Sequence, residues 1–255
     1  MIALIDGDVL VYMAMWEAES KEHARENFDS LFTSITESLF VDDYAMAIGN
    51  NEGSNFRYDI YDKYKANRSK SKSERPEWFY DLKSDIVNDY KGCTFAEYCE
   101  ADDMIRIWAY QIEKQLWENW NLEYGFIDDS YSKNYIVISV DKDLDCIEGK
   151  HYNPRKDLVY TIHEEDANYN YWKQIIMGDS TDNIPGVPGI GPKKAEKLLL
   201  EDPPAVAACK AYEKHYGEEG YNYLLANGKL IHILRTPTDY FHFSRTQYDQ
   251  AICAN

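Results

Sequence analysis

The sequence predicts an α/β protein with a central, mostly parallel sheet flanked by helices, and three observations support this. Short β-branched or aliphatic runs, typical of strands buried on both faces of a parallel sheet, alternate with longer segments of helical spacing. Several of these short runs end directly at acidic residues. The chain has 255 residues, enough to bury an extensive core. We therefore expect ligand sites at the carboxyl ends of the strands.

The individual elements follow from the spacing of the apolar residues. The run at 135–140 is the clearest strand, because it is continuous, β-branched and followed at once by an acidic segment. Beyond residue 161 the pattern is helical to about 234, with an interruption rich in Gly and Pro at 185–192. Strands are expected at residues 2–5, 44–48, 94–98 and 135–140, one long helix or two shorter ones at 9–40, and a further helix at 101–120.

Composition excludes several classes of protein. The 27 Lys and Arg residues against 45 Asp and Glu give a net charge of -18, which excludes a nucleic-acid-binding protein with a uniformly basic surface. A hydrophobic content of 44% and an aromatic content of 15% exclude a disordered acidic chain. The five cysteines form no CxxC pair, which argues against a disulfide framework and a zinc site. Without a long apolar run or a basic leader, we expect a cytoplasmic protein with no membrane partner.

One segment departs from the acidic composition. Between residues 63 and 75 there are six basic residues and a single acid, Glu74. Such a run is most often a solvated face or a flexible loop, and this interpretation stays open beside a nucleic-acid contact. The six basic residues are Lys63, Lys65, Arg68, Lys70, Lys72 and Arg75.

Acidic residues recur where predicted strands or helices end. In a parallel sheet these ends share one edge, and two carboxylates about 4 Å apart repel by roughly 4 kcal/mol at an effective dielectric near 20. A cluster of this kind requires cations, and oxygen ligands without paired His or Cys favour Mg²⁺ or Mn²⁺. Two such ions suit phosphodiester hydrolysis. The candidate ligands are Asp6, Glu100, Asp102, Asp103, Asp141, Asp143, Asp179 and Asp182.

The most specific pattern is a helix-hairpin-helix at residues 184–199. Gly189 and Gly191 flank Ile190, which predicts a tight turn whose backbone can approach a ligand closely, and Pro192 suits the first position of a helix. Backbone N–H groups and the positive end of a helix would bind a phosphate without reading the bases. An ordinary helical packing unit is the alternative. The lysines that would add positive charge are Lys193, Lys194 and Lys197.

These motifs, in this order, give the chain a resemblance to the 5′ nuclease superfamily. It includes flap endonucleases and 5′→3′ exonucleases, and the bacteriophage-type members are the most similar. The resemblance covers residues 2 to about 200. It rests on IDG around Asp6, YKANR at 64–68, EADD at 100–103, SVDKDLD at 139–145 and GDSTDNIPGVPGIGPKKA at 178–195.

The resemblance implies a nuclease core at 1–162 with a helical arch at about 55–90, and a helical DNA-binding region at 163–255 packed with it as one structural unit. It implies a metal-dependent, structure-specific DNA nuclease of DNA replication. The expected activity is that of a 5′→3′ exonuclease, a 5′-flap endonuclease or both. The expected substrates are 5′ ends, flaps and nicks, with the RNA of an RNA:DNA hybrid as a second substrate. We expect a monomer, in the host cytoplasm if a phage encodes the chain.

By the same resemblance, individual residues receive roles. The first of two Mg²⁺ or Mn²⁺ ions would be held by Asp6, Glu100, Asp102, Asp141 and Asp143, and the second by Asp179 and Asp182 with Asp143. Asp103 is ranked lower, while Asp8 and Asp145 are expected to orient neighbours. A K⁺ ion is expected at the hairpin. Arch residues that would contact DNA are Tyr64, which would stack on a terminal base, Lys65 and Arg68 at the scissile phosphate, and Lys70, Lys72 and Arg75 along the single strand.

One departure from the family pattern leaves alternatives open. Members of the family usually have an aspartate after the second strand, where this chain has Asn50, so the first metal site should be weaker or altered. Glu52 could substitute for it. A degenerate protein that binds branched DNA without cutting is therefore one alternative. A PIN-type single-strand ribonuclease is the other, although that class does not require the hairpin.

Overall fold

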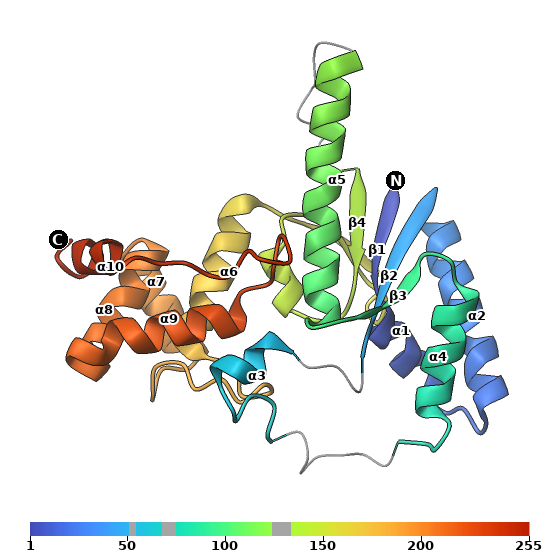
Figure 1. The fold of residues 1–255 in the computed structure, drawn as a ribbon, viewed down its shortest axis with the longest axis horizontal. Helices are drawn as coiled ribbons and strands as arrows, with labels where there is room; N and C mark the ends of the chain where they lie inside the picture. Colours follow the sequence, from blue (N-terminus) through green and yellow to red (C-terminus); the bar gives the residue numbers. More distant parts are fainter. Residues whose placement is uncertain (51–54, 68–74, 124–133, 255) are drawn as a thin grey trace. The chain divides into compact units, whose positions relative to one another are not determined.

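A computed structural model describes residues 1–50, 55–67, 75–123 and 134–254, with the side chains of residues 115–123 left aside. The chain divides into two compact units, each built from several segments (Figure 1). The first unit comprises Met1–Asn55, Glu74–Ile162 and Ile233–Thr238, and the second comprises Phe56–Ser73, His163–His232 and Asp239–Asn255.

The first unit contains, within the described residues, a six-stranded sheet of order β3-β2-β1-β4-β5-β6. β1 lies at its centre and pairs in parallel with β2 and β4, while β5 and β6 form an antiparallel edge hairpin. The five strands β1 to β5 are parallel and point the same way, so their carboxyl ends share one edge. The strands are β1 (Ile2–Asp6), β2 (Asp43–Gly49), β3 (Cys93–Ala96), β4 (Tyr135–Ile138), β5 (Gly149–Asn153) and β6 (Leu158–Ile162).

Helices cover the two faces of this sheet. Because side chains alternate along a strand, Ala3 and Ile5 of β1 pack on one side and Leu4 on the other. The first side is covered by α1 (Gly7–Met15), α2 (Lys21–Ser38) and α4 (Phe79–Asp89). The second side is covered by α5 (Ala101–Glu123), through Ile105 and Ala109 (Figure 1). A short 3₁₀ turn, η3 (Asp143–Cys146), follows β4.

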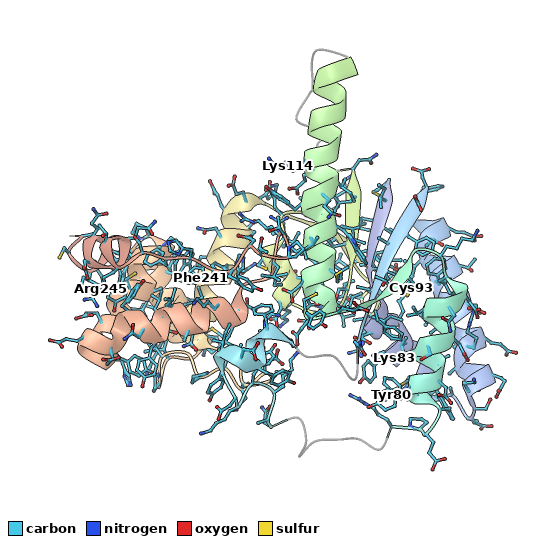
Figure 2. All side chains as sticks on the ribbon, viewed as in Figure 1. Tyr80, Lys83, Cys93, Lys114, Phe241 and Arg245 are labelled. Atoms are coloured by element: carbon cyan, nitrogen blue, oxygen red, sulfur yellow. The ribbon has the colours of Figure 1, made fainter. Side chains whose placement is uncertain are left out.

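The second unit is helical. Its core includes the fully buried Tyr212 and the largely buried Trp172 and Phe241, and Figure 2 labels Phe241. Arg57 is 3% exposed and donates hydrogen bonds to the carbonyl oxygens of Leu230 and His232, at 2.8 and 2.7 Å. The elements are α3 (Phe56–Ile60), α6 (Glu164–Met177), α7 (Pro192–Glu201), α8 (Pro204–Tyr216), η4 (Gly217–Glu219), α9 (Gly220–Ile231) and α10 (Arg245–Ile252).

The structure confirms the predicted α/β class and the four predicted strands, with boundaries that shift by one or two residues. The segment expected to hold one or two helices contains two, α1 and α2, because the chain turns at Glu17, whose φ is 64°, and Ser20 caps α2. Strands β5 and β6 were not predicted. No helix in the described part of the chain combines the length and apolar character needed to cross a membrane.

Candidate functional site

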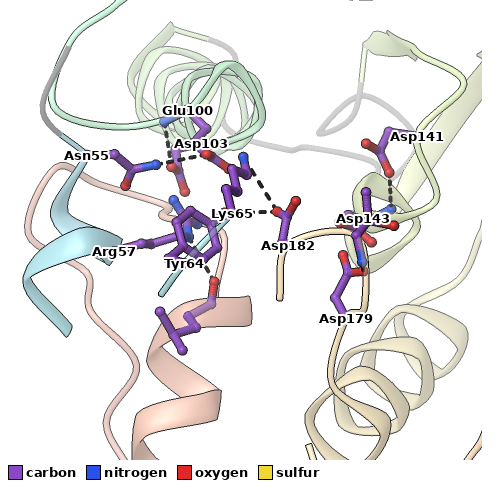
Figure 3. A network of polar contacts seen from close by, with 12 residues as sticks. Asn55, Arg57, Tyr64, Lys65, Glu100, Asp103, Asp141, Asp143, Asp179 and Asp182 are labelled. Carbon is purple, nitrogen blue, oxygen red and sulfur yellow. Dashed lines mark hydrogen bonds and ion pairs between the residues drawn. The ribbon is translucent and has the colours of Figure 1, made fainter. Parts of the chain in front are cut away.

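The centre of the candidate site is the carboxyl edge of β1 and β4. Asp6, the last residue of β1, caps α1 by accepting a hydrogen bond from the Val9 N–H at 3.3 Å. The buried Ser139, directly after β4, donates its hydroxyl to Asp6 Oδ2 at 2.8 Å and accepts the Asp141 N–H at 3.0 Å. Asp141 Oδ1 in turn accepts the Asp143 N–H at 2.9 Å (Figure 3). One serine therefore joins the carboxylate at the end of β1 to the backbone that follows β4.

The electrostatics show that five carboxylates form one cluster. Burial, followed by the charge of Asp8, raises the pKa of Asp6 to about 7, although the hydrogen bond from Ser139 acts in the opposite direction. Desolvation raises the pKa of Asp102 well above its ordinary value. The carboxylates that raise it further are, in order of effect, those of Asp6, Asp141, Glu100 and Asp143. These five predicted ligands are therefore brought together within the first unit.

The donor set of this cluster fits a hard divalent cation. Its members offer carboxylate oxygens, the ligand type that Mg²⁺ and Mn²⁺ prefer over the nitrogen and sulfur ligands of zinc sites. The raised pKa values of Asp6 and Asp102 also show that the charged form of the cluster is costly when no cation accompanies it. A divalent ion would offset this repulsion.

Asp103 has a different environment from its neighbours. It is fully buried, and its two carboxylate oxygens accept backbone N–H groups from Glu100 at 2.9 Å and from Leu234 at 3.0 Å. This arrangement holds the beginning of α5 and supports a structural role for Asp103. Glu100 itself accepts a hydrogen bond from the side-chain amide of the buried Asn55 at 2.8 Å (Figure 3).

A second pair of acids lies in the second unit. Ligand oxygens of Asp179 and Asp182 lie within 4.8 Å of each other. Asp182 Oδ2 accepts the Tyr64 hydroxyl at 2.9 Å and lies 3.5 Å from Lys65 Nζ (Figure 3). Asp179 Oδ1 accepts the Thr181 N–H at 2.6 Å. The loop that carries these acids thus contacts the part of the predicted arch that contains Tyr64 and Lys65.

The expected stacking role of Tyr64 does not agree with its position. Its side chain is 2% exposed and belongs to the hydrophobic core of the second unit, where its ring also contacts Tyr58 at 5.5 Å between centroids. The ring leaves no face for a terminal base in this structure. Its hydroxyl instead positions Asp182.

The other basic residues of the predicted arch are only partly described. Lys65 has a left-handed backbone, with φ of 56°, and its N–H donates to the Asp182 carbonyl at 2.9 Å. Arg75 in the first unit is exposed and lies over the rings of Phe79 and Tyr12. The predicted DNA contacts that lie outside the described residues are Arg68, Lys70 and Lys72.

The predicted hairpin connects α6 and α7, and its glycines Gly189 and Gly191 are exposed. Gly189 has a φ of 76°, which favours glycine. At Gly191 the φ is -99°, and an added Cβ would meet no atom within 4 Å, so neither backbone strain nor internal packing requires a glycine there. Lys194 Nζ donates to the Gly189 carbonyl at 2.8 Å. Lys193 and Lys197 are exposed near the start of α7.

Sequence reasoning missed three polar residues that shape the site. Ser139 and Asn55 bind predicted ligands, and the buried Lys83 on α4 forms an ion pair with Asp8. Ser139 begins the SVDKDLD motif at 139–145, two residues before Asp141, so its place in that motif was a usable signal, whereas Asn55 lies outside the five motifs that carry the resemblance. Lys83 gave none, because its role depends on how α4 packs on the sheet.

The fold and the carboxylate cluster together define an α/β protein with an acidic site at the carboxyl ends of a parallel sheet. No family model matches the chain. The DNA polymerase I of Rhizobium leguminosarum is 32% identical over 155 residues, covering 57% of this chain and 14% of that protein. The 5′-3′ exonuclease of Buchnera aphidicola subsp. Schizaphis graminum is 26% identical over 215 residues, covering 78% of this chain and 69% of that protein. The chain spans less than a quarter of the DNA polymerase I relatives.

Solved structures with the same fold come from bacteriophage T5. The T5 D15 protein co-crystallised with metal ions matches with a TM-score of 0.71 at 20% identity, over 90% of this chain and 88% of that one. The T5 D15 flap endonuclease in a pseudo-enzyme-product complex with DNA and metal ions matches with a TM-score of 0.67 at 19% identity and the same coverage. At this identity the likeness concerns the fold. The comparisons confirm the predicted resemblance to the 5′ nuclease superfamily and the predicted fold class.

Proposed function

We propose that the chain is a divalent-metal-dependent nuclease that acts on the 5′ ends or 5′ flaps of DNA and releases 5′-phosphorylated products. The observation that carries this proposal is the carboxylate cluster of the first unit, where Ser139 joins Asp6 to the Asp141 backbone at the carboxyl edge of β1 and β4. A relative named 5′-3′ exonuclease and the fold of a flap endonuclease support the reaction class.

The residues of the cluster have defined tasks in this proposal. A divalent ion held there would supply a hard positive charge for water activation and for the developing charge on the phosphate. Ser139 holds the Asp6 carboxylate and the Asp141 backbone, so that both acids are placed for this ion with little reorganisation. The residues that would hold a first ion are Asp6, Glu100, Asp102, Asp141 and Asp143, and Asp179 with Asp182 would contribute to a second.

In this proposal, basic and backbone groups of the second unit bind the DNA substrate. Lys65 is held in place by its backbone and side-chain contacts to Asp182, and it stabilises negative charge on the scissile phosphate together with Arg68. The open backbone at Gly189 and Gly191 binds the duplex without reading its sequence. Mg²⁺ or Mn²⁺ is the expected ion, and the RNA strand of an RNA:DNA hybrid is a second expected substrate.

The proposal is tested with 5′-labelled flap, nicked, blunt and RNA:DNA substrates in the presence of Mg²⁺ or Mn²⁺. We expect short labelled products from flap and nicked DNA, and none when EDTA is present. The ratio of products shows whether flap or exonuclease cleavage dominates. Cleavage confined to single-stranded RNA would instead support a PIN-type ribonuclease.

A second candidate function, binding of branched DNA without cleavage, is favoured by Asn50. This residue is exposed after β2 and offers an amide where related nucleases are expected to have a carboxylate. Asn50→Asp distinguishes the two functions. A nuclease with a weakened metal site should gain activity at low Mg²⁺ concentration in this variant. Tight flap binding without cleavage in either protein would support the binding function.

A further inference from the structure

A buried lysine lies at the same edge of the sheet as the carboxylate cluster. The Lys83 side chain on α4, labelled in Figure 2, is 4% exposed. Its Nζ donates to the Gly49 carbonyl at the end of β2, at 2.7 Å, and lies 2.9 Å from Asp8 Oδ1. Asp8 Oδ2 accepts the Gly49 N–H at 2.9 Å. Three elements, α1, β2 and α4, are thus joined by one closed set of polar contacts.

The ion pair controls how much negative charge Asp8 adds to the site. A lysine with so little exposure is costly unless an opposite charge accompanies it, and Asp8 provides that charge. Asp8 also acts on the cluster, because it lies two residues after Asp6, in the first turn of the helix α1 that Asp6 caps. The ammonium of Lys83 therefore offsets a carboxylate that otherwise repels Asp6.

The same contacts lie next to Asn50, the residue at which this chain differs from the family pattern. Gly49 directly precedes Asn50, and both its carbonyl and its N–H are held by the Lys83–Asp8 pair. The end of β2 therefore carries a neutral amide beside a neutralised carboxylate. Among the described residues, the other carboxylates at this edge come from the end of β1 and from the segments that follow β3 and β4.

We propose that Lys83 is a positioning residue that sets the divalent-metal affinity of the carboxylate cluster, by pairing with Asp8 and anchoring Gly49. This inference rests on the metal binding in the proposed function. It predicts whether each charge change strengthens or weakens metal binding. Removal of the ammonium alone leaves the Asp8 charge available to attract a cation, whereas removal of the carboxylate alone takes one negative charge from the site and so weakens the attraction for a cation.

The test is the dissociation constant of Mn²⁺, measured by isothermal titration calorimetry on the full chain. We expect Lys83→Met to bind Mn²⁺ about fivefold more tightly and Asp8→Asn about fivefold more weakly than the wild type. The double variant should lie within about twofold of the wild type, since the two charge changes cancel. Lys21→Met is the matched control. Lys21 forms an ion pair at 2.8 Å with Asp85, which lies on α4 as Lys83 does, but Asp85 is not among the predicted metal ligands.

Each outcome decides the question. If the single variants bind Mn²⁺ as the wild type does, or if both weaken binding, Lys83 has only a structural role and the inference is overturned. A wild type that binds no Mn²⁺ contradicts the proposed metal site as well. If Lys83→Met does not fold, Asp8→Asn and the double variant carry the test, because adding Lys83→Met must then restore the affinity that Asp8→Asn loses.

Discussion

At the scale of single residues, Ser139 links two strand ends through one hydroxyl. It donates to Asp6 and accepts from the Asp141 backbone, and both acids are predicted metal ligands. Hydrogen bonds that involve a charged partner contribute more to stability than neutral ones. The small size of serine allows this double contact directly after β4.

Ser139→Ala should lower the free energy of unfolding by about 2 kcal/mol, because a buried carboxylate loses its donor and a backbone N–H loses its acceptor. Urea denaturation measures this change. Ser84→Ala is the control, since Ser84 donates only to the Tyr80 carbonyl on an exposed face of α4 and should change stability little. Equal losses in the two variants would contradict the linking role.

A buried histidine provides a pH-dependent contribution to stability. His151 is 2% exposed, contacts the Ile147 carbonyl at 2.8 Å and stacks on Tyr160. Burial lowers the pKa of His151 below its ordinary value of 6.5. The unfolded chain therefore binds a proton more readily than the folded one, and the stability contribution is lost as the pH falls below about 6.5.

His151→Gln keeps a hydrogen-bond donor but does not titrate. We expect the stability difference between variant and wild type to shift in favour of the variant as the pH is lowered from about 7 to about 5. Comparing the two proteins removes the opposite contribution of Asp6, whose raised pKa favours the folded state at low pH. A difference that is constant across this range would contradict the buried neutral histidine.

At the scale of elements, the loop between α6 and α7 contains two glycines that are explained differently, one by the fold and one by the proposed function. Gly189 needs its glycine for a left-handed backbone, whereas Gly191 has an ordinary φ and open space around its Cα. A glycine that the fold does not require is consistent with a backbone that an external ligand must approach.

Gly191→Ala should therefore change the unfolding free energy by less than about 1 kcal/mol but weaken the binding of duplex DNA. Fluorescence anisotropy with a labelled duplex measures the affinity, and thermal denaturation provides the internal control. Unchanged affinity would indicate that the hairpin packs helices and does not contact DNA.

The charge of the same element gives an independent test. Lys193→Ala with Lys194→Ala should weaken duplex binding about equally for all sequences and reduce the salt slope by up to about 0.9 for each lost phosphate contact. An unchanged slope would mean that these lysines are ordinary surface charges.

The elements also show what the sequence can predict. Continuous apolar runs such as β4 predict buried strands, because a strand covered on both faces has no alternation. The edge hairpin of β5 and β6 escaped prediction since its strands mix polar and apolar residues, and Leu158 and Val159 of β6 are about half exposed. Predicted ligands were found through motifs at strand ends, whereas the contacts of Lys83 and the burial of Tyr64 depend on packing between distant segments.

At the scale of the whole molecule, a net charge of -18 opposes both DNA and a compact acidic site. In the proposed function, basic groups at the hairpin attract the DNA backbone, and divalent cations neutralise the clustered carboxylates. The folded state should therefore be stabilised by metal, because the unfolded chain does not assemble the cluster.

Mn²⁺ at about 100 times its dissociation constant should stabilise the fold by about 2.7 kcal/mol, seen as a rise in melting temperature. Asp141→Asn with Asp143→Asn should remove most of this rise. An equal rise in the double variant would place the bound metal elsewhere.

The central claim is that the carboxylate cluster at the carboxyl ends of β1, β3 and β4 catalyses the hydrolysis of DNA from its 5′ side. Single-turnover cleavage of a 5′-labelled flap substrate in Mg²⁺ tests this claim most directly. We predict that the wild type cleaves the flap, and that Asp141→Asn with Asp143→Asn lowers the rate by at least about a thousandfold while flap binding in Ca²⁺ remains. Cleavage by the double variant at close to the wild-type rate would contradict the account.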